Sequence, residues 1–245
     1  EAGAQIPTPT PTSVTAGGGF VLLMGAEVSN AGAITTPRGQ TALVAGDDFI
    51  LRRGYGTQEN QASTTRGAVV RGLLDGGSLS GAVTNSGMIE AAQGDITLAG
   101  RAITQDGALV ATTSVNQRGT IHLLNSASDA EGSVTLGADS LTLILPELDS
   151  DDTALNSQRD ALIVASDEAN LNRFSTTEGG LDDRSLLAGR LDQSRVGIAT
   201  GGAVVFEGGS QTVANGGQVA VQAEAGRITV EDGASIDVSG VVGVA

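Results

Sequence analysis

The chain has 245 residues, of which 36 are glycine, only 2% are aromatic and none is cysteine or tryptophan. Its formal net charge of −15 argues against nucleic acid or an anionic membrane as a partner, and the lack of cysteine excludes disulfides and thiol chemistry. No apolar run reaches the roughly 18 residues of a membrane span. Since 40% of the residues are hydrophobic, we expect a folded domain with a core of Val, Ile, Leu and Ala.

The N-terminal residues 1–17 alternate proline with threonine and hold three of the five prolines. Such a stretch is typical of an extended linker or an edge segment rather than a packed element. We expect residues 18–245 to form a single domain. The sequence opens at Glu1 without a signal-like segment, and we expect it to be a piece of a longer protein.

From residue 18 onward two short patterns recur: a strand of the form Gly-x-β-x-β, and a turn followed by a strand. The turn-and-strand pattern occurs at Val83–Ile89 and returns at Ile103–Leu109, an interval of about 20 residues that is typical of a structural repeat. Short strands repeated near a constant period, and separated by glycine, predict stacked coils of an all-β solenoid with about 20 residues per coil. The Gly-x-β-x-β strand occurs at Gly19–Leu23, Gly39–Leu43, Gly94–Leu98, Gly119–Leu123, Gly132–Leu136, Gly202–Phe206, Gly217–Val221 and Gly226–Val230.

The strand pattern predicts which side chains are buried. Positions two apart in a strand share a face, so the two aliphatic residues point inward while intervening residues such as Asp95 and Thr97 face outward. We expect Val83 and Ile103 to be stacked neighbours in coils about 4.8 Å apart. Glycine is expected to turn the corners with positive φ. The residues predicted to be buried are Ile96, Leu98, Ile121, Leu123, Val134 and Leu136.

Three side-chain amides fall at equivalent positions of the coils, at Asn30, Asn85 and Gln105. Such amides can stack into a ladder that bridges successive coils. They can equally be turn residues that tolerate a left-handed φ. The sequence leaves both interpretations open.

Two stretches interrupt the period. Residues 54–82 hold the only tyrosine and many polar residues, which indicates a loop or hairpin outside the coils. Residues 146–197 are rich in charge, and the spacing of their apolar residues predicts a short helix packed on the flank. We expect the chain to leave the coils near Pro146 and to return near Val196, so that the coils on either side stack directly.

A family resemblance begins at residues 17–51, which read GGGFVLLMGAEVSNAGAITTPRGQTALVAGDDFIL. This stretch resembles the large bacterial exoproteins of the filamentous haemagglutinin type, and residues 158–166, 191–196 and 201–209 are similar to the body of such proteins. The resemblance implies a right-handed parallel β-helix, export by a two-partner secretion system and a role in adhesion or aggregation. The family's secretion domain carries Asn-Pro-Asn motifs, and because none occurs here, recognition by the transporter is not assigned to these residues.

Candidate catalytic groups are few. The single histidine, His122, takes the outward position of its strand, where we expect an exposed surface residue; no Gly-x-Ser-x-Gly motif accompanies it. One histidine without cysteine also argues against zinc. Polysaccharide lyases with a β-helix use carboxylates to hold Ca²⁺ beside a basic residue, but we find no acid and base at one angular position and expect the acidic residues to be solvated turns. These acidic residues are Asp47, Asp48, Asp149, Asp151, Asp152, Asp182, Asp183, Glu231 and Asp232.

These features predict a structural or adhesive rod segment of a secreted bacterial surface exoprotein, acting in adhesion, aggregation or biofilm without catalysis, metal or cofactor. We expect it outside the cell or on the outer surface of a Gram-negative bacterium. The expected partners are the outer-membrane two-partner secretion transporter, for the full-length protein, and a surface receptor, a glycan or a second copy; nucleic acid and membrane insertion are not expected. The alternatives are a lyase-like polysaccharide-active enzyme and a glycan-binding module, whose face would carry residues 54–82 or 146–197. No binding residue is assigned.

Overall fold

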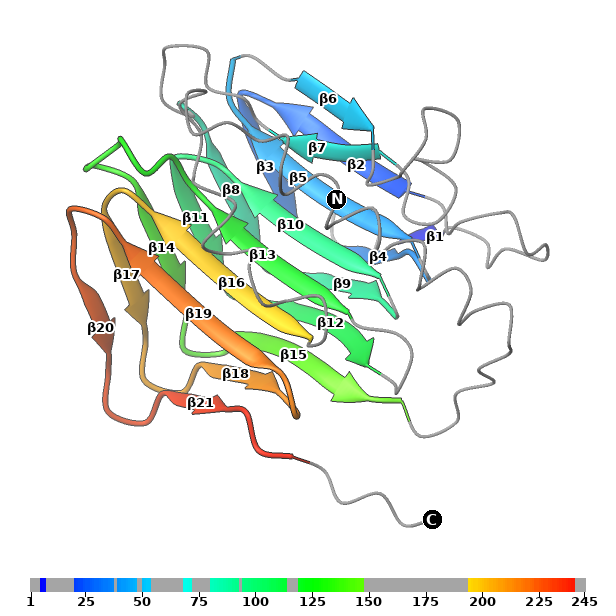
Figure 1. Cartoon of the computed structure of the whole chain (residues 1–245). Helices are drawn as coiled ribbons and strands as arrows, with labels where there is room; N and C mark the ends of the chain where they lie inside the picture. The colour runs from blue at the N-terminus through cyan, green and yellow to red at the C-terminus, as the bar shows by residue number, and fades with distance from the viewer. Residues whose placement is uncertain are drawn as a thin grey trace, which may run out of the picture.

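The computed structural model describes residues 5–7, 20–37, 39–47, 50–53, 68–71, 80–92, 94–113, 119–147 and 194–240. All the regular secondary structure among these residues is β-strand, in agreement with the all-β prediction. The strands form three parallel sheets of seven, six and six strands, which we call A, B and C, and one antiparallel pair (Figure 1).

Each parallel sheet is built from strands that are far apart in the sequence. In spatial order, sheet A consists of β1 (Gln5–Pro7), β4 (Ala33–Thr35), β9 (Met88–Ala91), β12 (Ala108–Thr113), β15 (Leu141–Pro146), β18 (Gln211–Ala214) and β21 (Ser235–Asp237). Sheet B consists of β2 (Phe20–Gly25), β5 (Gln40–Ala45), β10 (Asp95–Ala99), β13 (Thr120–Leu124), β16 (Arg195–Thr200) and β19 (Gln218–Ala223). Sheet C consists of β3 (Glu27–Asn30), β8 (Ala82–Asn85), β11 (Ala102–Gln105), β14 (Ser133–Leu136), β17 (Ala203–Phe206) and β20 (Ile228–Val230). The antiparallel pair consists of β6 (Ile50–Arg53) and β7 (Ala68–Arg71).

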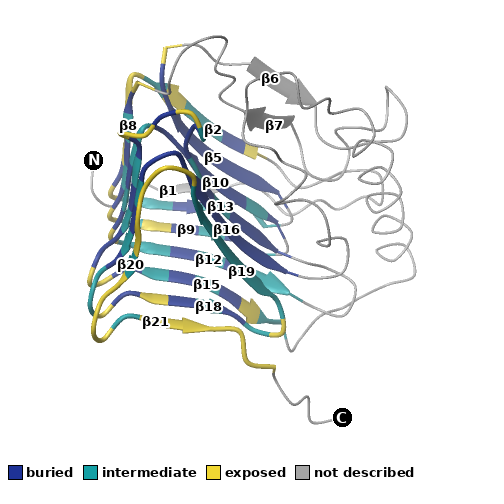
Figure 2. Ribbon diagram, turned by 60° about the vertical axis from the view of Figure 1, so that its left-hand side comes forward, coloured by how far each residue is buried: buried dark blue, intermediate teal, exposed yellow. Residues whose placement is uncertain are grey.

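From β2 onward the chain visits the three sheets in the constant order B, C, A, and each visit adds one parallel strand beside the previous strand of that sheet. The antiparallel pair interrupts this order once, between β5 and β8. Parallel strands cannot be joined by a tight hairpin, and here the strands of the other two sheets supply the crossover. Figure 2 shows the resulting layers of strands around a shared interior. This arrangement is consistent with a parallel β-solenoid.

The length of chain in one turn of the stack varies. Val83 pairs with Ile103 in sheet C, as predicted. In sheet B, Ile96 pairs with Ile121, which lies further along the chain than the predicted period would place it. The period therefore holds for some turns and is too short for others, because the corners between the sheets differ in length while the strands stay in register.

The interior between the sheets is aliphatic. All six side chains that the sequence predicts to be buried are 0% exposed, which confirms the inward register of the Gly-x-β-x-β strands. Phe206 is the one aromatic side chain in this core among the described residues. Full burial of each large aliphatic side chain stabilises the fold by about 1.5–3 kcal/mol, so a stack of small aliphatic columns is stable without the aromatic residues that the composition lacks.

At most of the repeated positions, glycine has a different role from the one predicted. Among the described residues, glycine has a positive φ only at Gly209, Gly216 and Gly233, so the repeated corner glycines are not left-handed. They lie instead where the backbones of successive corners touch. A Cβ atom on Gly107 would lie 2.0 Å from the carbonyl oxygen of Gly87. These corners require glycine because any side chain would push two turns of the stack apart.

The three equivalent amides form a ladder inside the corner between sheets C and A. Asn30 Nδ2 donates to Asn85 Oδ1 at 2.7 Å, and Asn85 Nδ2 donates to Gln105 Oε1 at 2.8 Å. Asn30 is 7% exposed and the other two are 0% exposed. Gln105 Nε2 ends the ladder by donating to the carbonyl oxygen of Gly107 at 2.8 Å. Of the two interpretations that the sequence left open, the ladder is correct.

The longer insertion leaves the stack intact. β15 ends at Pro146 and β16 begins at Arg195, yet Ile121 pairs directly with Val196 in sheet B. The turns on either side of the insertion therefore stack directly, as predicted. The helix predicted for this insertion falls on residues 148–193, which lie outside the described part of the chain.

Parts of the two remaining irregular segments are described. Within the predicted excursion 54–82, β7 pairs antiparallel with β6, outside the three parallel sheets. Of the N-terminal residues 1–17, Gln5–Pro7 form β1, which pairs with β4 at the edge of sheet A. Pro7 suits an edge strand because proline has no N–H to donate to a neighbour.

Candidate functional site: the outer faces of the sheets

The outer face of sheet C is hydrophilic. In each strand of this sheet one residue between the two inward positions points outward, and the pairing of the strands places these residues in a single column. Most of them are hydroxyl residues that are half-buried or exposed, so this face offers hydrogen bonds to solvent but no acid–base group along its centre. The column consists of Ser29, Thr84, Thr104, Thr135, Val205 and Thr229.

The outer face of sheet A carries a group of large aliphatic side chains, which we call the aliphatic patch. Met88 is 40% exposed and Leu145 is 37% exposed, and the other members are half-buried. Val110 pairs with Leu143, and Leu143 with Val213, so the patch is continuous across neighbouring strands. Contiguous exposed apolar surface marks interaction sites on soluble proteins. The patch consists of Met88, Val110, Leu141, Leu143, Leu145 and Val213.

The outer face of sheet B is largely buried. Every residue of β5 and β16 is buried, on the outer face as well as on the inner one. The outward side chains of Ala42, Val44 and Ala99 form a second apolar cluster, against which Leu22 and Leu124 pack. Sheet B therefore has apolar side chains packed on both of its faces. Strands buried on both faces typically consist of continuous hydrophobic residues rather than alternating ones.

One side of this buried outer face is polar. Gln40, Asp95, Thr120 and Arg195 occupy one column, with one residue from each of four adjacent strands, and we call them the polar column. Gln40 is 1% exposed and Arg195 is 3% exposed. The hydroxyl of Thr120 donates a hydrogen bond to the carboxylate of Asp95. The pairing of the strands therefore collects an acid, a guanidinium and two neutral polar groups at one angular position of the stack.

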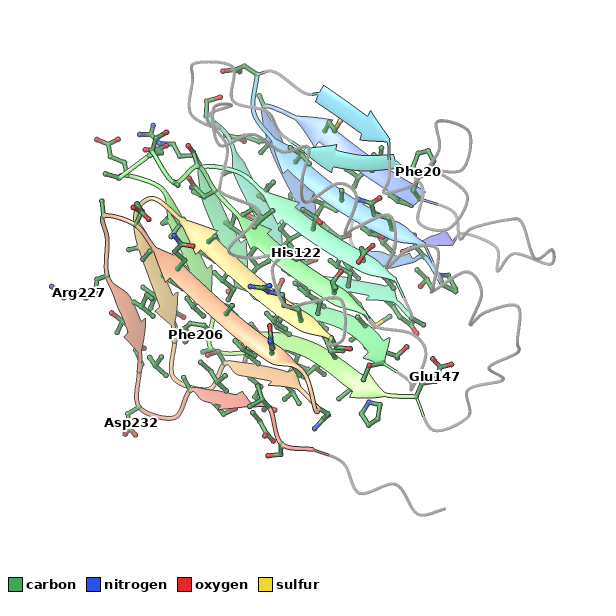
Figure 3. The ribbon with its side chains drawn as sticks, in the orientation of Figure 1. Phe20, His122, Glu147, Phe206, Arg227 and Asp232 are labelled. Atoms are coloured by element: carbon green, nitrogen blue, oxygen red, sulfur yellow. The ribbon has the colours of Figure 1, made fainter. Side chains whose placement is uncertain are left out.

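His122 lies beside the polar column, two residues along β13. It points outward, as predicted, but is half-buried rather than exposed (Figure 3). Its pairing partner in β16 is Gly197. A Cβ atom on Gly197 would lie 3.0 Å from His122 Nδ1 and 3.6 Å from Arg195 Nε. Because Gly197 has no side chain, the imidazole and the guanidinium can lie close together.

The sequence predicts no acid and base at one angular position, whereas the strand pairing places Asp95 and Arg195 in one column on either side of Thr120, with His122 two residues along the strand from Thr120. The set was hidden because the chain enters β16 through Ser194 rather than glycine, and because the long insertion separates Arg195 from Thr120, its partner in register. Aligning the alternation of β16 with that of β13 is the signal that finds it. Such a set can move protons and bind an anion.

Two observations limit what the polar column can do. Gln40, Thr120 and Arg195 are each no more than 9% exposed, so a polymeric substrate has little access to them. Across the described strands and turns, no group of three or more His, Cys, Asp or Glu residues is arranged to hold a metal ion. The column therefore has the composition of a catalytic or anion-binding site but the burial of a structural one.

The acidic pairs that the structure describes lie in turns. Asp47 is exposed and accepts a hydrogen bond from Ser80 Oγ at 2.7 Å, which links the two ends of the segment between β5 and β8. Glu231 and Asp232 are exposed in the turn between β20 and β21, where Glu231 Oε2 accepts a hydrogen bond from the N–H of Gly208 at 3.1 Å. Both are solvated turns, as predicted. Of the acidic residues singled out in the sequence, those outside the described part of the chain are Asp48, Asp149, Asp151, Asp152, Asp182 and Asp183.

Comparison with known proteins adds no relative. No family model, no curated protein and no solved structure matches this chain. In the part of the chain that the structure describes, no helix is long and apolar enough to cross a membrane.

Proposed function

We propose that this chain is a right-handed parallel β-helix and serves as a structural and adhesive rod segment of a secreted bacterial surface exoprotein. The observation that carries the proposal is the continuity of the stack, since Ile121 and Val196 pair directly across a long insertion. A repeat architecture in which each turn contacts only its neighbours can be extended and can accept insertions on its side. It is suited to holding a binding surface away from the cell.

The stiffness of such a rod would come from three kinds of contact between successive turns. Backbone hydrogen bonds join parallel strands along all three sheets. Aliphatic columns fill the interior, and the amide ladder from Asn30 to Gln105 adds hydrogen bonds between side chains. Each turn also covers the strand edges of the turn below it, which would otherwise pair with other chains. None of this requires catalysis.

The adhesive surface in this proposal is the aliphatic patch on sheet A. Among the described strands in the interior of the sheets, this is the face with exposed large apolar side chains, since Met88 and Leu145 are each more than a third exposed. Apolar contact of this kind fits a protein receptor on a host or bacterial surface, or a second copy of the chain. For the full-length protein, the proposal includes export through the outer membrane by a two-partner secretion transporter and a location on the surface of a Gram-negative bacterium.

A polysaccharide-active enzyme is the second candidate, and the polar column with His122 is the observation that favours it. In that case Asp95 and His122 would exchange protons with the substrate, while Arg195 would bind a carboxylate group of the substrate. The burial of the column weighs against this candidate. A glycan-binding module is the third, and a glycan array probed with the full chain distinguishes it from a protein adhesin.

The adhesive proposal is tested with beads coated with the full chain and mixed with bacterial or host cells. We expect coated beads to bind, and a variant with Val110→Thr and Leu143→Thr to bind several-fold less, because threonine keeps the strand propensity but removes apolar surface. Thr135→Val on sheet C is the matched control and should bind as the unmodified chain does. Equal binding by the patch variant would exclude the patch, and depolymerisation of a polysaccharide that His122→Ala abolishes would favour the enzyme.

A further inference from the structure

The side chains inside the corner between sheets C and A change along the stack, from amides to apolar and hydroxyl side chains. In the earlier turns this corner holds the amide ladder, which ends at Gln105. The strand pairing then continues the same column with Leu136 and Phe206, both of them fully buried. Gln105 Nε2 makes the last amide contact of the ladder, donating also to the carbonyl oxygen of Leu141 in the next turn at 3.4 Å. Beyond it, no side-chain amide continues the ladder at this corner among the described residues.

Hydroxyl side chains appear at the same corner where the amides stop. Ser140 takes the place that Gly107 has in the preceding turn, and Thr142 takes the place of Leu109. The next turn repeats both hydroxyl residues in register. The four hydroxyl residues of these two turns, which we call the hydroxyl quartet, are Ser140, Thr142, Ser210 and Thr212.

All four residues of the hydroxyl quartet are 0% exposed, and none of their side-chain oxygens has a hydrogen-bond partner among the described residues. A buried hydroxyl without a partner has lost its hydrogen bonds to water and gained none in the protein, which is unfavourable. Native structures contain few such groups. Four of them at one corner, in two matched pairs, indicate a bound molecule that can both donate and accept hydrogen bonds.

The spacing of the stack identifies that molecule. Adjacent parallel strands lie about 4.8 Å apart, which is too far for a direct hydrogen bond between hydroxyls of about 2.8 Å. One water that bonds to both hydroxyls at a near-tetrahedral angle spans about 4.6 Å. The bridge needs room as well as partners, and threonine at 142 and 212 is smaller than Leu109 in the same column.

We propose that ordered waters bridge the hydroxyl quartet, with one water between Ser140 and Ser210 and one between Thr142 and Thr212. These waters take over from the amide ladder at this corner and join the later turns through hydrogen bonds in the interior. Water fits because it is small and neutral and both donates and accepts, which serves two hydroxyls whose protons can rotate.

The experiment compares thermal unfolding of the full chain with that of Thr142→Val, Thr212→Val and the double variant. Valine has the shape of threonine without its hydroxyl, so no cavity opens. Each single variant leaves a water and the opposite hydroxyl without a partner, so we expect each to lower the Tm by about 2–4 °C. The double variant should lower it by less than the sum of the two. Thr135→Val, half-buried on sheet C, is the matched control and should leave the Tm unchanged.

A crystal structure of the full chain gives the direct readout. The proposal expects a water oxygen within about 2.8 Å of both Thr142 Oγ1 and Thr212 Oγ1. Single variants that raise the Tm would show that the hydroxyls are dry and unpaired, and would overturn the proposal. Additive losses of Tm with no water between the two threonines would overturn it as well.

Discussion

Asn85 donates a hydrogen bond from its side-chain amide to that of Gln105 at 2.8 Å, across one turn of the stack and inside its core. The bond joins two turns through side chains, in addition to the backbone bonds between β8 and β11. Because both residues are 0% exposed, neither amide can form a hydrogen bond with solvent water if its partner is lost. The stability of this corner therefore depends on the match of donor and acceptor.

We predict that Asn85→Asp destabilises the chain by more than the roughly 1–3 kcal/mol expected for an unpaired buried group. A carboxylate can accept from Asn30 but cannot donate to Gln105, and burial penalises its charge. Burial raises the folded pKa of such an aspartate, so the loss should be largest at neutral pH and shrink as the pH falls and the side chain regains a proton. Urea unfolding at several pH values measures this, with exposed Ser86→Ala as the control. A loss independent of pH would contradict the ladder.

Gly107→Ala should destabilise the chain by about 3 kcal/mol, the upper part of the range for overpacking. The new Cβ atom would lie 2.0 Å from the carbonyl oxygen of Gly87, and backbone cannot move aside as a flexible side chain can. Gly240→Ala is the matched control: a Cβ atom there meets nothing within 4 Å, and its effect should stay within about 0.5 kcal/mol. Equal unfolding midpoints for the two variants would show that the corners are not in contact.

How far the sequence predicts this fold depends on whether a feature is local. The stacking of Val83 on Ile103 could be predicted because both copies of the pattern lie within one short turn. The reason for glycine at Gly107 could not, because it depends on the distance between two turns. The exposure of the outer faces could not be predicted either. Val44 and Leu143 are both aliphatic residues on the outer faces of strands, yet Val44 is 0% exposed and Leu143 is only half-buried. The sequence of a strand does not show which other part of the chain covers its outer face.

Leu123→Asp should unfold at least the turns around β13. Leu123 is 0% exposed in the aliphatic core, and a charge there has neither partner nor water, a penalty that exceeds the stability of a typical local unit. Leu143→Asp, on the outer face of sheet A, introduces the same charge at a half-buried site and should cost far less. Circular dichroism melting of both variants checks the register. An unchanged melt for Leu123→Asp would show that the inward and outward faces are assigned the wrong way round.

Asp237 should titrate below the usual range of an aspartate. The hydroxyl of Ser239 donates to Asp237 Oδ1, and the N–H of Ser239 donates to the same oxygen at 2.8 Å. These bonds, the side-chain one first, lower the pKa of Asp237 below its ordinary value because they favour the ionised carboxylate. With a lowered folded pKa, the stabilisation is present above the unfolded pKa and is lost as the pH falls through the folded one. NMR titration checks this: Ser239→Ala should raise the pKa, and an unchanged value would refute the assignment.

The central claim is that strands far apart in the sequence stack in one parallel register, including across the insertion before β16. The chain has no cysteine, so a single engineered pair reports on that register without interference. Thr135 pairs with Val205, on the hydrophilic outer face of sheet C. Adjacent parallel strands at about 4.8 Å place the two Cα atoms within the roughly 4.4–6.8 Å that a disulfide spans.

The most direct measurement is therefore disulfide formation in Thr135→Cys/Val205→Cys, read by mass spectrometry of the oxidised monomer. Thr229 is the next residue in the same column, and Thr135→Cys/Thr229→Cys, two turns or about 9.6 Å apart, is the matched control. The stack predicts that the first pair closes within one chain and that the second does not. Closure of the control pair without closure of the first would contradict the proposed order of the turns.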